Sequence, residues 1–290
     1  MDDVDALSTA EANRRLYAQI AASYDATEEC VTDSRFRGQL LAALRRASAE
    51  LPRDRPLDVL DACGGSGNAS LLLFEMGIRP VTVDISPEML SIFEKQALLR
   101  GHQPEYVTAE IRDFFESSAR RWDLITFSSA LHHLDDVEAV VETALAHLRP
   151  GGILLTMFDP TRVTWTGQRL RRIDYLLHII VRTPGRLPGL FRSRLAPGRS
   201  SVDELREMGI VAERHSLVGI DDLALVRLLE ARGNIVIEHT RYFEGRFAFT
   251  GWIFRALGSP SSFHLMVRSA PAPDAAPSHV RRASDAAAKQ

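Results

Sequence analysis

The chain has 290 residues, of which 45% are hydrophobic and 25% charged, and its formal net charge is −3. These values are typical of a globular α/β domain with an elaboration, and the overall charge does not favour nucleic acid. Two cysteines in unrelated contexts, Cys30 and Cys63, argue against a disulfide scaffold and indicate a reducing compartment. The first residues lack the basic and apolar parts of a signal peptide, so we expect a cytoplasmic protein.

Two helices are predicted within residues 1–50, after a frayed segment at residues 1–10. Their apolar residues recur at helical spacing. The first helix contains Leu16, Tyr17, Ile20 and Tyr24, and the second contains Leu40, Leu41, Leu44 and Leu51. We expect both helices to pack before the sheet begins.

Apolar runs then alternate with helical segments, which is the order expected of a parallel sheet. Strands are predicted at residues 57–61, 80–84, 104–108, 123–128 and 152–158. Of the helices between them, the clearest covers residues 136–149; Asp135 or Asp136 caps it and Pro150-Gly151-Gly152 ends it. Ser86 is expected to cap another helix, with Pro87 at its first position.

The alternation stops at residues 160–220, where no strand is evident. Residues 162–199 contain nine arginines and one acid, Asp174. A helix capped by Asp221 or Asp222 follows, and then come a strand at Ile235–Tyr242, a helix near 246–257 and a strand at Ser262–Arg268. Residues 270–290 are rich in Ala, Pro and Ser, which predicts a disordered tail.

The segment LDVLDACGGSGNAS, residues 57–70, is the most informative part of the chain. A strand ending at Asp61 leads through a glycine-rich turn into a helix, the arrangement that brings backbone N–H groups close to a ligand. A dinucleotide fingerprint beginning at Gly65 has Gly67 but then Ser70 in place of its third glycine. An acid before the turn suits an ammonium group, and Asp84 at the end of the second strand suits a ribose diol. This pattern favours an adenosyl ligand with an amino-acid tail over NAD.

Six motifs in order resemble the class I S-adenosylmethionine (SAM)-dependent methyltransferases, of the broad group that contains the ubiquinone/menaquinone C-methyltransferases. They are YAQIAASYD (17–25), LDACGGSG (60–67), VTVDISPEML (81–90), AEIRDF (109–114), WDLITFSSALHHL (122–134) and LRPGGILLTMFD (148–159). The resemblance implies a doubly wound, mostly parallel seven-stranded sheet with helices on both faces, a Rossmann-like fold. It also implies SAM as cofactor and S-adenosylhomocysteine (SAH) as product. The chain departs from the family at Cys63, which replaces the usual first glycine of the turn.

The resemblance also implies the site, with the helices of residues 1–50 covering the cofactor. Asp61 and the turn hold the methionine end of the cofactor, Asp84 the ribose, and Glu110 the adenine amino group, with Asp113 as the rival acid expected instead to cap a helix. The cofactor-binding residues are therefore predicted to be Tyr24, Asp61, Cys63, Gly65, Gly67, Asp84, Ile85, Met89, Glu110, Ile111 and Ser128. His133, and secondarily His132, are candidate catalytic bases, although the pair could simply shape the pocket. Tyr17 and Tyr24 either lie over the cofactor or fill the core. The histidine and acid spacings predict no metal site.

The predicted function is transfer of a methyl group to O, C or N of a small or amphipathic metabolite. Residues 51–269 would form the methyltransferase domain, and the helical, arginine-rich segment 160–220 would form its substrate lid. Residues 170–194 could contact a membrane or lipid, the alternative being a solvated basic face. No motif for nucleic acid is evident, and the oligomeric state stays open. Alternatives are a SAM-binding protein that transfers no methyl group, a non-catalytic partner subunit and, with less support, an NAD(P)-dependent oxidoreductase.

Overall fold

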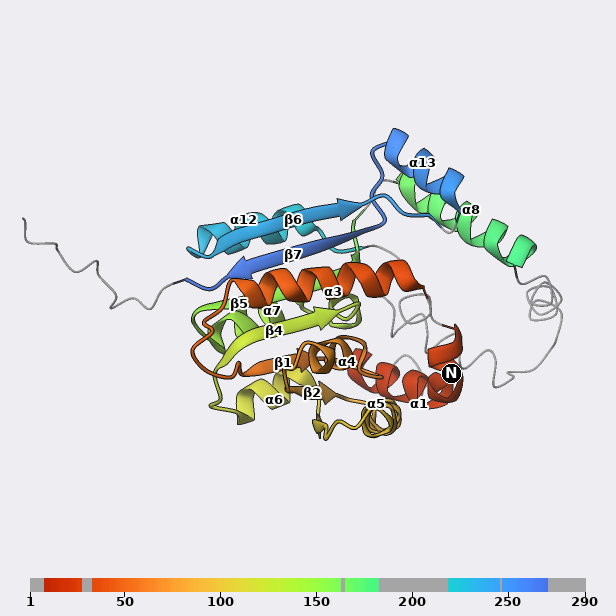
Figure 1. Ribbon diagram of the computed structural model, residues 1–290. Coiled ribbons are helices and arrows are strands. Elements are labelled where there is room, and N and C mark those ends of the chain that lie inside the picture. Colours follow the sequence, from red (N-terminus) through yellow and green to blue (C-terminus); the bar gives the residue numbers. More distant parts are fainter. Residues whose placement is uncertain (1–7, 28–32, 163–164, 183–218, 246, 271–290) are drawn as a thin grey trace, which may run out of the picture.

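One seven-stranded sheet runs through the computed structural model, which describes residues 8–27, 33–162, 165–182, 219–245 and 247–270 (Figure 1). The strands are β1 (Val59–Ala62), β2 (Pro80–Asp84), β3 (Glu105–Thr108), β4 (Trp122–Ser128), β5 (Leu148–Pro160), β6 (Ile235–Tyr242) and β7 (Ser262–Arg268). Their order is β3-β2-β1-β4-β5-β7-β6; β1 to β5 pair in parallel, and β7 is antiparallel to both neighbours. The predicted fold class is confirmed.

Helices cover both faces of this sheet (Figure 1). They are α1 (Thr9–Thr27), α3 (Ser34–Ala49), α4 (Asn68–Glu75), α5 (Pro87–Leu99), α6 (Ile111–Ser117), the 3-10 turn η1 (Leu131–His133), α7 (Val137–Ala146), α8 (Trp165–Arg182), α12 (Asp222–Ala231) and α13 (Ala248–Ala256). Helices α3 and α4 share one apolar core with the sheet, and α6, α7 and α12 share the other. Helix α5 packs against α4.

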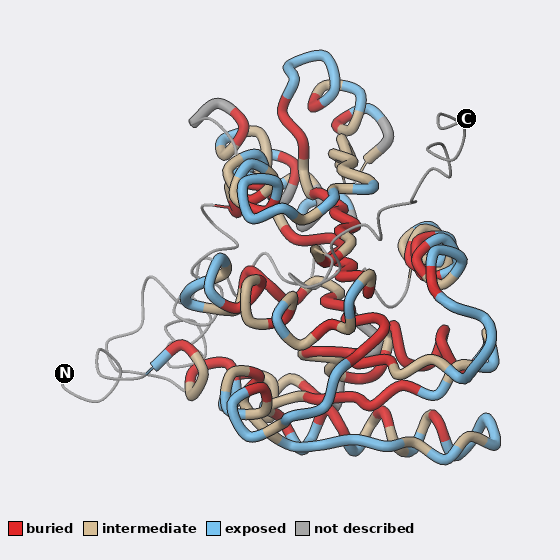
Figure 2. The backbone as a smooth tube through the Cα atoms, turned by 90° about the vertical axis from the view of Figure 1, so that its left-hand side faces the viewer, coloured by how far each residue is buried: buried red, intermediate tan, exposed pale blue. Residues whose placement is uncertain are grey.

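Alternation along the central strands divides the two cores. In β4, Leu124 packs with α3 and α4, whereas Ile125 packs with α6 and α7; in β5, Leu155 and Leu154 divide in the same way. Successive side chains of a strand point to opposite faces, so a strand covered on both sides is apolar throughout. Figure 2 shows the resulting band of buried backbone through the middle of the molecule. Because both faces of the sheet are buried in this way, the carboxyl ends of its parallel strands lie together along one side of the molecule.

Helix starts agree well with the sequence. The side chains of Ser86, Asp136 and Asp221 each accept a hydrogen bond from the backbone N–H three residues later. Each acceptor satisfies one of the N–H groups that a helix leaves unpaired at its start. The predicted caps at these three positions are confirmed.

Several boundaries differ from the prediction. The helix predicted at residues 136–149 ends at Ala146, and β5 begins at Leu148, before the Pro-Gly-Gly turn signal. Leu148 pairs with Trp122 at the start of β4, so strand pairing outweighs the local turn preference there. The predicted frayed segment is also too long, because α1 begins at Thr9 and that residue is buried.

Much of the predicted lid lies outside the described residues. Helix α8 accounts for its first part, and a single bridge between Thr161 and Ile220 joins the two ends of the segment. Residues 183–218 and the predicted tail after residue 270 are not described. Within the described part of the chain, no helix is long and apolar enough to cross a membrane.

Candidate functional site

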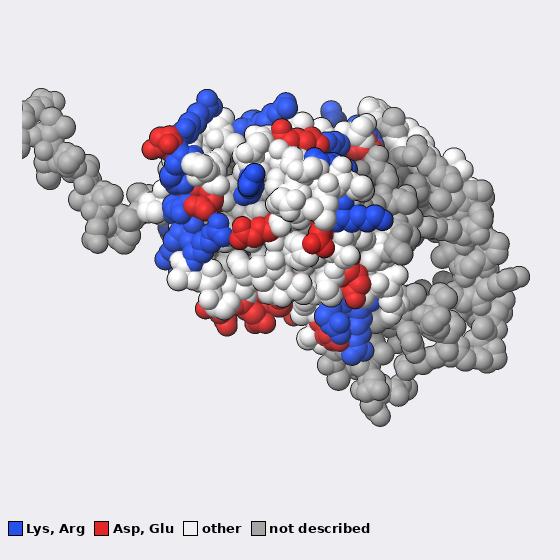
Figure 3. Space-filling view, turned by 60° about the horizontal axis from the view of Figure 1, so that its bottom comes forward, with Lys and Arg blue, Asp and Glu red and all other residues white. Residues whose placement is uncertain are grey.

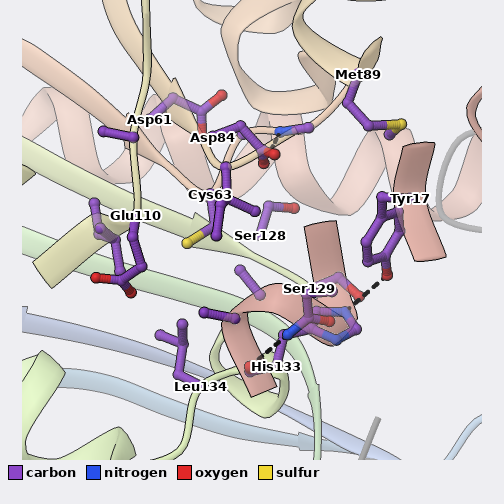
Figure 4. Close-up of a pocket in the computed structure, with 18 of the residues that line it drawn as sticks. Tyr17, Asp61, Cys63, Asp84, Met89, Glu110, Ser128, Ser129, His133 and Leu134 are labelled. Carbon is purple, nitrogen blue, oxygen red and sulfur yellow. Dashed lines mark hydrogen bonds between the residues drawn. The ribbon is translucent and has the colours of Figure 1, made fainter. Parts of the chain in front are cut away.

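A cavity of about 250 Å³ lies at the carboxyl ends of β1, β2 and β4. The sheet order reverses direction between β1 and β4, and such a switch point is where open α/β sheets bind ligands. Figure 4 shows its lining: two aspartates near the glycine turn, Glu110 to one side, and His133 and Leu134 on the far side. Helix α1 supplies Thr9, Ala10, Asn13, Tyr17 and Tyr24 to the lining.

The glycine-rich turn has little room for side chains. A Cβ on Gly64 would lie 2.5 Å from Thr82 Cγ2, and one on Gly67 would lie 2.1 Å from the Phe93 ring. Gly65 has a φ of +55° and faces the cavity, where a Cβ would meet only Met89 at 3.5 Å and Asp84 at 4.0 Å. Gly65 therefore leaves its space to whatever occupies the cavity.

Cys63 also has a left-handed backbone, with φ of +55°. A glycine adopts this conformation without steric cost, whereas a side chain does so at a cost of about 1 kcal/mol. Burial raises the pKa of the Cys63 thiol well above its ordinary value, with the acids around it adding to the shift. The thiol is thus a neutral, small lining group.

Asp61 is fully buried at the end of β1. Its Oδ2 accepts hydrogen bonds from the backbone N–H of Ser70 (3.0 Å) and the Ser70 hydroxyl (2.6 Å), whereas Oδ1 has no partner among the described residues. Burial raises the pKa of Asp61 to about 7 against the lowering effect of these bonds. A cationic ligand would supply what Oδ1 lacks, because a buried acceptor without a partner costs free energy.

Asp84 ends β2, the neighbouring strand, and its carboxylate faces the same turn. Its Oδ2 accepts from the Gly65 N–H at 2.8 Å and its Oδ1 from the Ser86 N–H at 2.9 Å. Burial raises the pKa of Asp84, although these backbone bonds oppose the shift. A carboxylate accepts about four hydrogen bonds, so both oxygens retain capacity for ligand hydroxyls.

Glu110 lies at the start of α6 and lines the cavity. Its Oε2 accepts from the backbone N–H groups of Arg112 (2.7 Å) and Asp113 (3.2 Å), so Glu110 itself caps the helix. The expectation that Asp113 caps α6 is wrong, because Asp113 lies inside the first turn. Capping occupies Oε2 and leaves Oε1 to meet a ligand.

His133 is the last residue of η1 and faces α1. Its Nε2 is 3.0 Å from the Tyr17 hydroxyl, the two rings meet edge to face, and its carbonyl oxygen accepts from Asn13 Nδ2 at 2.9 Å (Figure 4). Thr9 adds a hydrogen bond from its hydroxyl to Asp135 just beyond. Helix α1 is therefore fastened across the cavity by polar contacts to the segment that carries His133.

His132 has a different environment. It is buried, it does not line the cavity, and its Nδ1 is 2.9 Å from Oδ1 of Asp159, which also accepts from the His132 backbone N–H at 3.1 Å. Burial raises the pKa of Asp159 to about 7, and backbone N–H groups of η1 oppose the shift. The ring centroids of His132 and His133 are 3.9 Å apart. His132 and Asp159 thus support the turn that presents His133.

Comparison with known proteins identifies a family that agrees with this geometry. The methyltransferase domain family matches residues 33–187, which is more than half of the chain. The chain belongs to the methyltransferase domain family. The resemblance drawn from the six motifs is confirmed.

Several curated relatives match part of this methyltransferase chain. A tRNA 5-carboxymethoxyuridine methyltransferase of Escherichia coli (strain K12) is 31% identical over 129 residues, 42% of this chain and 49% of that protein. A trans-aconitate 2-methyltransferase of Azoarcus sp. (strain BH72) is 32% identical over 168 residues, 57% of this chain and 58% of that protein. The chain thus spans about half the length of the curated relatives it matches.

Solved structures share the fold over nearly the whole chain. The N-methyltransferase NodS from Bradyrhizobium japonicum WM9, in complex with SAH, has a TM-score of 0.52 at 14% identity and covers 89% of this chain and 98% of its own. The plantazolicin methyltransferase BpumL, in complex with SAH, has a TM-score of 0.53 at 13% identity, covering 90% and 95%. At such identities the likeness shows the fold alone.

The cavity of this methyltransferase chain brings together all the predicted cofactor residues except Gly67, which shapes the turn against Phe93 instead. Sequence reasoning missed several lining residues, most of them polar: Thr9, Asn13, Ser66, Asn68, Arg112, Ser129, Leu134 and Asp135. Thr9, Asn13 and Tyr17 share one face of α1 at intervals of four residues, and this spacing was the available signal. Among the described residues, no group of three or more His, Cys, Asp or Glu could hold a metal ion.

Proposed function

We propose that the chain is a SAM-dependent methyltransferase acting on a small or amphipathic metabolite. The observation that carries the proposal is the pair of buried carboxyl groups, Asp61 and Asp84, on two adjacent strand ends around Gly65 in one cavity. A ligand with an ammonium group and a ribose diol separated by a short chain matches this pair. NAD offers a pyrophosphate at the corresponding place, where two acids would repel it.

Each part of SAM has groups in the cavity lining that suit it. Asp61 Oδ1 would meet the ammonium group and Asp84 the ribose hydroxyls, while Glu110 Oε1 would accept from the adenine amino group. Ile85, Met89 and Ile111 supply apolar contacts for the adenine ring, and Ser128 follows at the end of β4. Polar groups at fixed positions within a mainly apolar lining are typical of cofactor sites.

SAM would supply an activated methyl group on a sulfonium, which a nucleophile displaces in line. The task of this chain is to bind both reactants, orient them and exclude water. Where the nucleophile is a hydroxyl group, His133 is the proposed proton acceptor. Tyr17, 3.0 Å from Nε2, would hold the imidazole ring and leave when substrate takes its place.

The charges around the cavity indicate an acceptor that is neutral or cationic. Among the described residues, the acids that line it are Asp61, Asp84, Glu110 and Asp135, and the basic residues are Arg112 and His133. A polyphosphate or a nucleic-acid backbone would be repelled by this set. One relative carries a tRNA methyltransferase name, but Figure 3 shows acids and bases interspersed on one face rather than a basic tract. We therefore propose a metabolite rather than RNA.

The first test is calorimetric titration with SAH, with NADH as the control ligand. We expect SAH alone to bind, and Asp84→Ala to abolish binding while the far-ultraviolet circular dichroism stays unchanged. A folded Asp84→Ala variant that keeps wild-type affinity would contradict the assignment. The control is Asp113→Ala, an acid of similar sequence context outside the cavity lining, which should bind SAH normally.

Transfer itself needs a second experiment, since binding alone would also fit a SAM-binding partner subunit. Isotope-labelled SAM is incubated with pools of neutral and cationic small molecules, and labelled products are separated by chromatography. Labelled product that disappears in Asp84→Ala supports the methyltransferase; tight SAH binding without any product supports the non-catalytic alternative. His133→Asn should then lower turnover of hydroxyl acceptors more than SAH affinity.

A further inference from the structure

Helix α8 exposes a row of large apolar side chains to solvent. On one face Ile173, Leu176 and Ile180 are each more than half exposed. On the opposite face Gly167 and Asp174 are buried, and Leu170, Arg171 and Leu177 are half-buried. A helix that packs all of its apolar residues on its own domain would not expose such a row.

Arg171 fixes this orientation. Its Nη2 donates to the carbonyl oxygens of Thr161 (3.0 Å), Pro260 (2.8 Å) and Ser261 (2.7 Å), which tie α8 to the ends of β5 and β7. Burial lowers the pKa of Arg171 to about 10, so the group stays protonated and its bonds persist at neutral pH. The exposed apolar side of α8 is therefore held outward by a buried charged group.

Helix α13 lies beside α8 and also exposes large apolar side chains (Figure 1). Thr250 and Phe254 face inward and are buried, whereas Phe249 and Trp252 face outward, Trp252 with 71% of its surface exposed. The two outward sides together form what we call the α8–α13 face: Arg169, Arg172, Ile173, Leu176 and Ile180 of α8, and Phe249, Trp252 and Arg255 of α13.

The charge of the α8–α13 face indicates its partner. Its charged members are all arginines, and the only acid on the two helices among the described residues, Asp174, is buried. The rest of the chain outweighs this local positive charge, since the net charge is −3. Residues 183–218, the other candidate to cover the face, contain six arginines and four acids, so their net charge is also positive and like charges would oppose that arrangement.

We propose that the α8–α13 face docks on an anionic membrane surface. Exposed Trp and Phe with aliphatic side chains enter the headgroup boundary, and flanking arginines bind acidic headgroups, as in interfacial amphipathic helices. Figure 1 places both helices at the edge of the sheet to which β4 and β6 point, the edge where the cavity lies. Docking would bring the cavity mouth close to molecules that partition into the lipid.

The test is vesicle co-sedimentation of the full chain with two lipid compositions. Vesicles of phosphatidylcholine with an equal part of phosphatidylglycerol should bind it, vesicles of phosphatidylcholine alone should bind it much less, and salt should weaken binding. A Trp165→Phe background leaves two tryptophans, the buried Trp122 and the exposed Trp252. In that background, the fluorescence of Trp252 should shift to shorter wavelength when anionic vesicles are added. No binding, or equal binding to both compositions, would overturn the proposal.

Matched variants distinguish binding through the α8–α13 face from nonspecific hydrophobic binding. Ile180→Ser with Trp252→Ser should lower partitioning about tenfold, and Leu99→Ser, an equally exposed apolar residue on α5, should leave it unchanged. Arg169→Glu with Arg172→Glu should remove the preference for anionic lipid, with Arg227→Glu on α12 as control. If Ile180→Ser instead abolishes self-association seen without vesicles, a second copy covers the face and the membrane proposal is wrong. None of these readouts depends on SAM binding.

Discussion

Asp61 is a buried carboxyl group whose pKa lies at about 7 because of burial, so at neutral pH it is half protonated without ligand. An ammonium group next to Oδ1 would favour the ionised form and lower the pKa again. Ligand binding and proton release are therefore linked, and SAH affinity should rise as the pH increases through 7.

The corresponding experiment is SAH titration at pH 7 in two buffers of different ionisation enthalpy. We expect release of about half a proton per ligand, the fraction bound at a pH equal to the pKa. Asp61→Asn should abolish the release and weaken binding. Identical heats in the two buffers would show that Asp61 does not meet the ammonium group.

Asp159 has the same raised pKa but a different partner, the η1 turn. Its folded-state pKa exceeds the unfolded one, so its stabilising contribution is complete below about pH 4 and is lost as the pH rises through 7. Asp159→Asn keeps an acceptor oxygen without the charge and should be more stable than wild type at pH 8. Asp159→Ala removes the acceptor for His132 and should cost about 3 kcal/mol.

Urea unfolding at pH 5 and pH 8 checks both variants. The Asn variant should gain more relative to wild type at pH 8 than at pH 5, and the Ala variant should lose at both. Equal stability of the two variants would mean that Asp159 does not support η1 through its hydrogen bonds.

Helix α1 is fastened over the cavity by polar contacts rather than by a large core. Its apolar cluster contains Ala12 and Leu16 with Ile20 partly buried, while Thr9 and Asn13 bond to the η1 side. Thr9→Ala with Asn13→Ala should lower SAH affinity roughly thirtyfold, since each lost bond is worth about 1 kcal/mol.

The thermal midpoint of this double variant should hardly change, because the sheet carries most of the core. Calorimetric affinity and a melting curve measure the two effects separately. Glu11→Ala is the matched control: it lies on the same helix and bonds only to the exposed Arg14 and Arg15. A control that weakens SAH as much as the double variant would exclude a specific role for the fastening.

Prediction from the sequence succeeded where the pattern was periodic and local. Strands β2 and β7, the caps at Ser86 and Asp136, and the carboxylates of Asp61 and Asp84 at strand ends follow from alternation and turn chemistry. It failed where distant pairing decides: Leu148 belongs to β5 because Trp122 pairs with it. The polar residues of α1 were missed because they interrupt an apolar pattern, and their role appears only in the hydrogen bonds that they make to the η1 segment.

The two ends of the sheet differ in function: the cavity lies at one end, and a network of ion pairs stabilises the other. At the end away from the cavity, Asp123 is buried and accepts from Arg55 (2.6 and 2.7 Å), Arg149 (3.0 Å) and the Asp58 N–H (2.8 Å). Burial alone would raise the pKa of Asp123, but these partners outweigh it and the pKa is lowered. Its stabilising effect is present above the unfolded pKa and disappears as the pH falls through the folded value.

Asp123→Ala should therefore destabilise the chain by about 2 kcal/mol at neutral pH, less than a fully buried pair because the arginines are partly solvated. SAH affinity should not change, because Asp123 begins β4 and the cavity lies beyond its other end. Chemical unfolding and titration of the same sample test both statements. Glu105→Ala, which removes an exposed pair with Arg120, should alter neither.

The family match begins at residue 33, so α1 lies before it although α1 lines the cavity. A molecule held beneath this helix would leave more easily once the contacts from Thr9, Asn13 and Tyr17 have separated. The pace of a catalytic cycle would then be governed by the undocking of this helix instead of by transfer of the methyl group from sulfur. Solvent viscosity would slow the steady state, and related enzymes could acquire different speeds by altering α1 while the chemical centre stays the same.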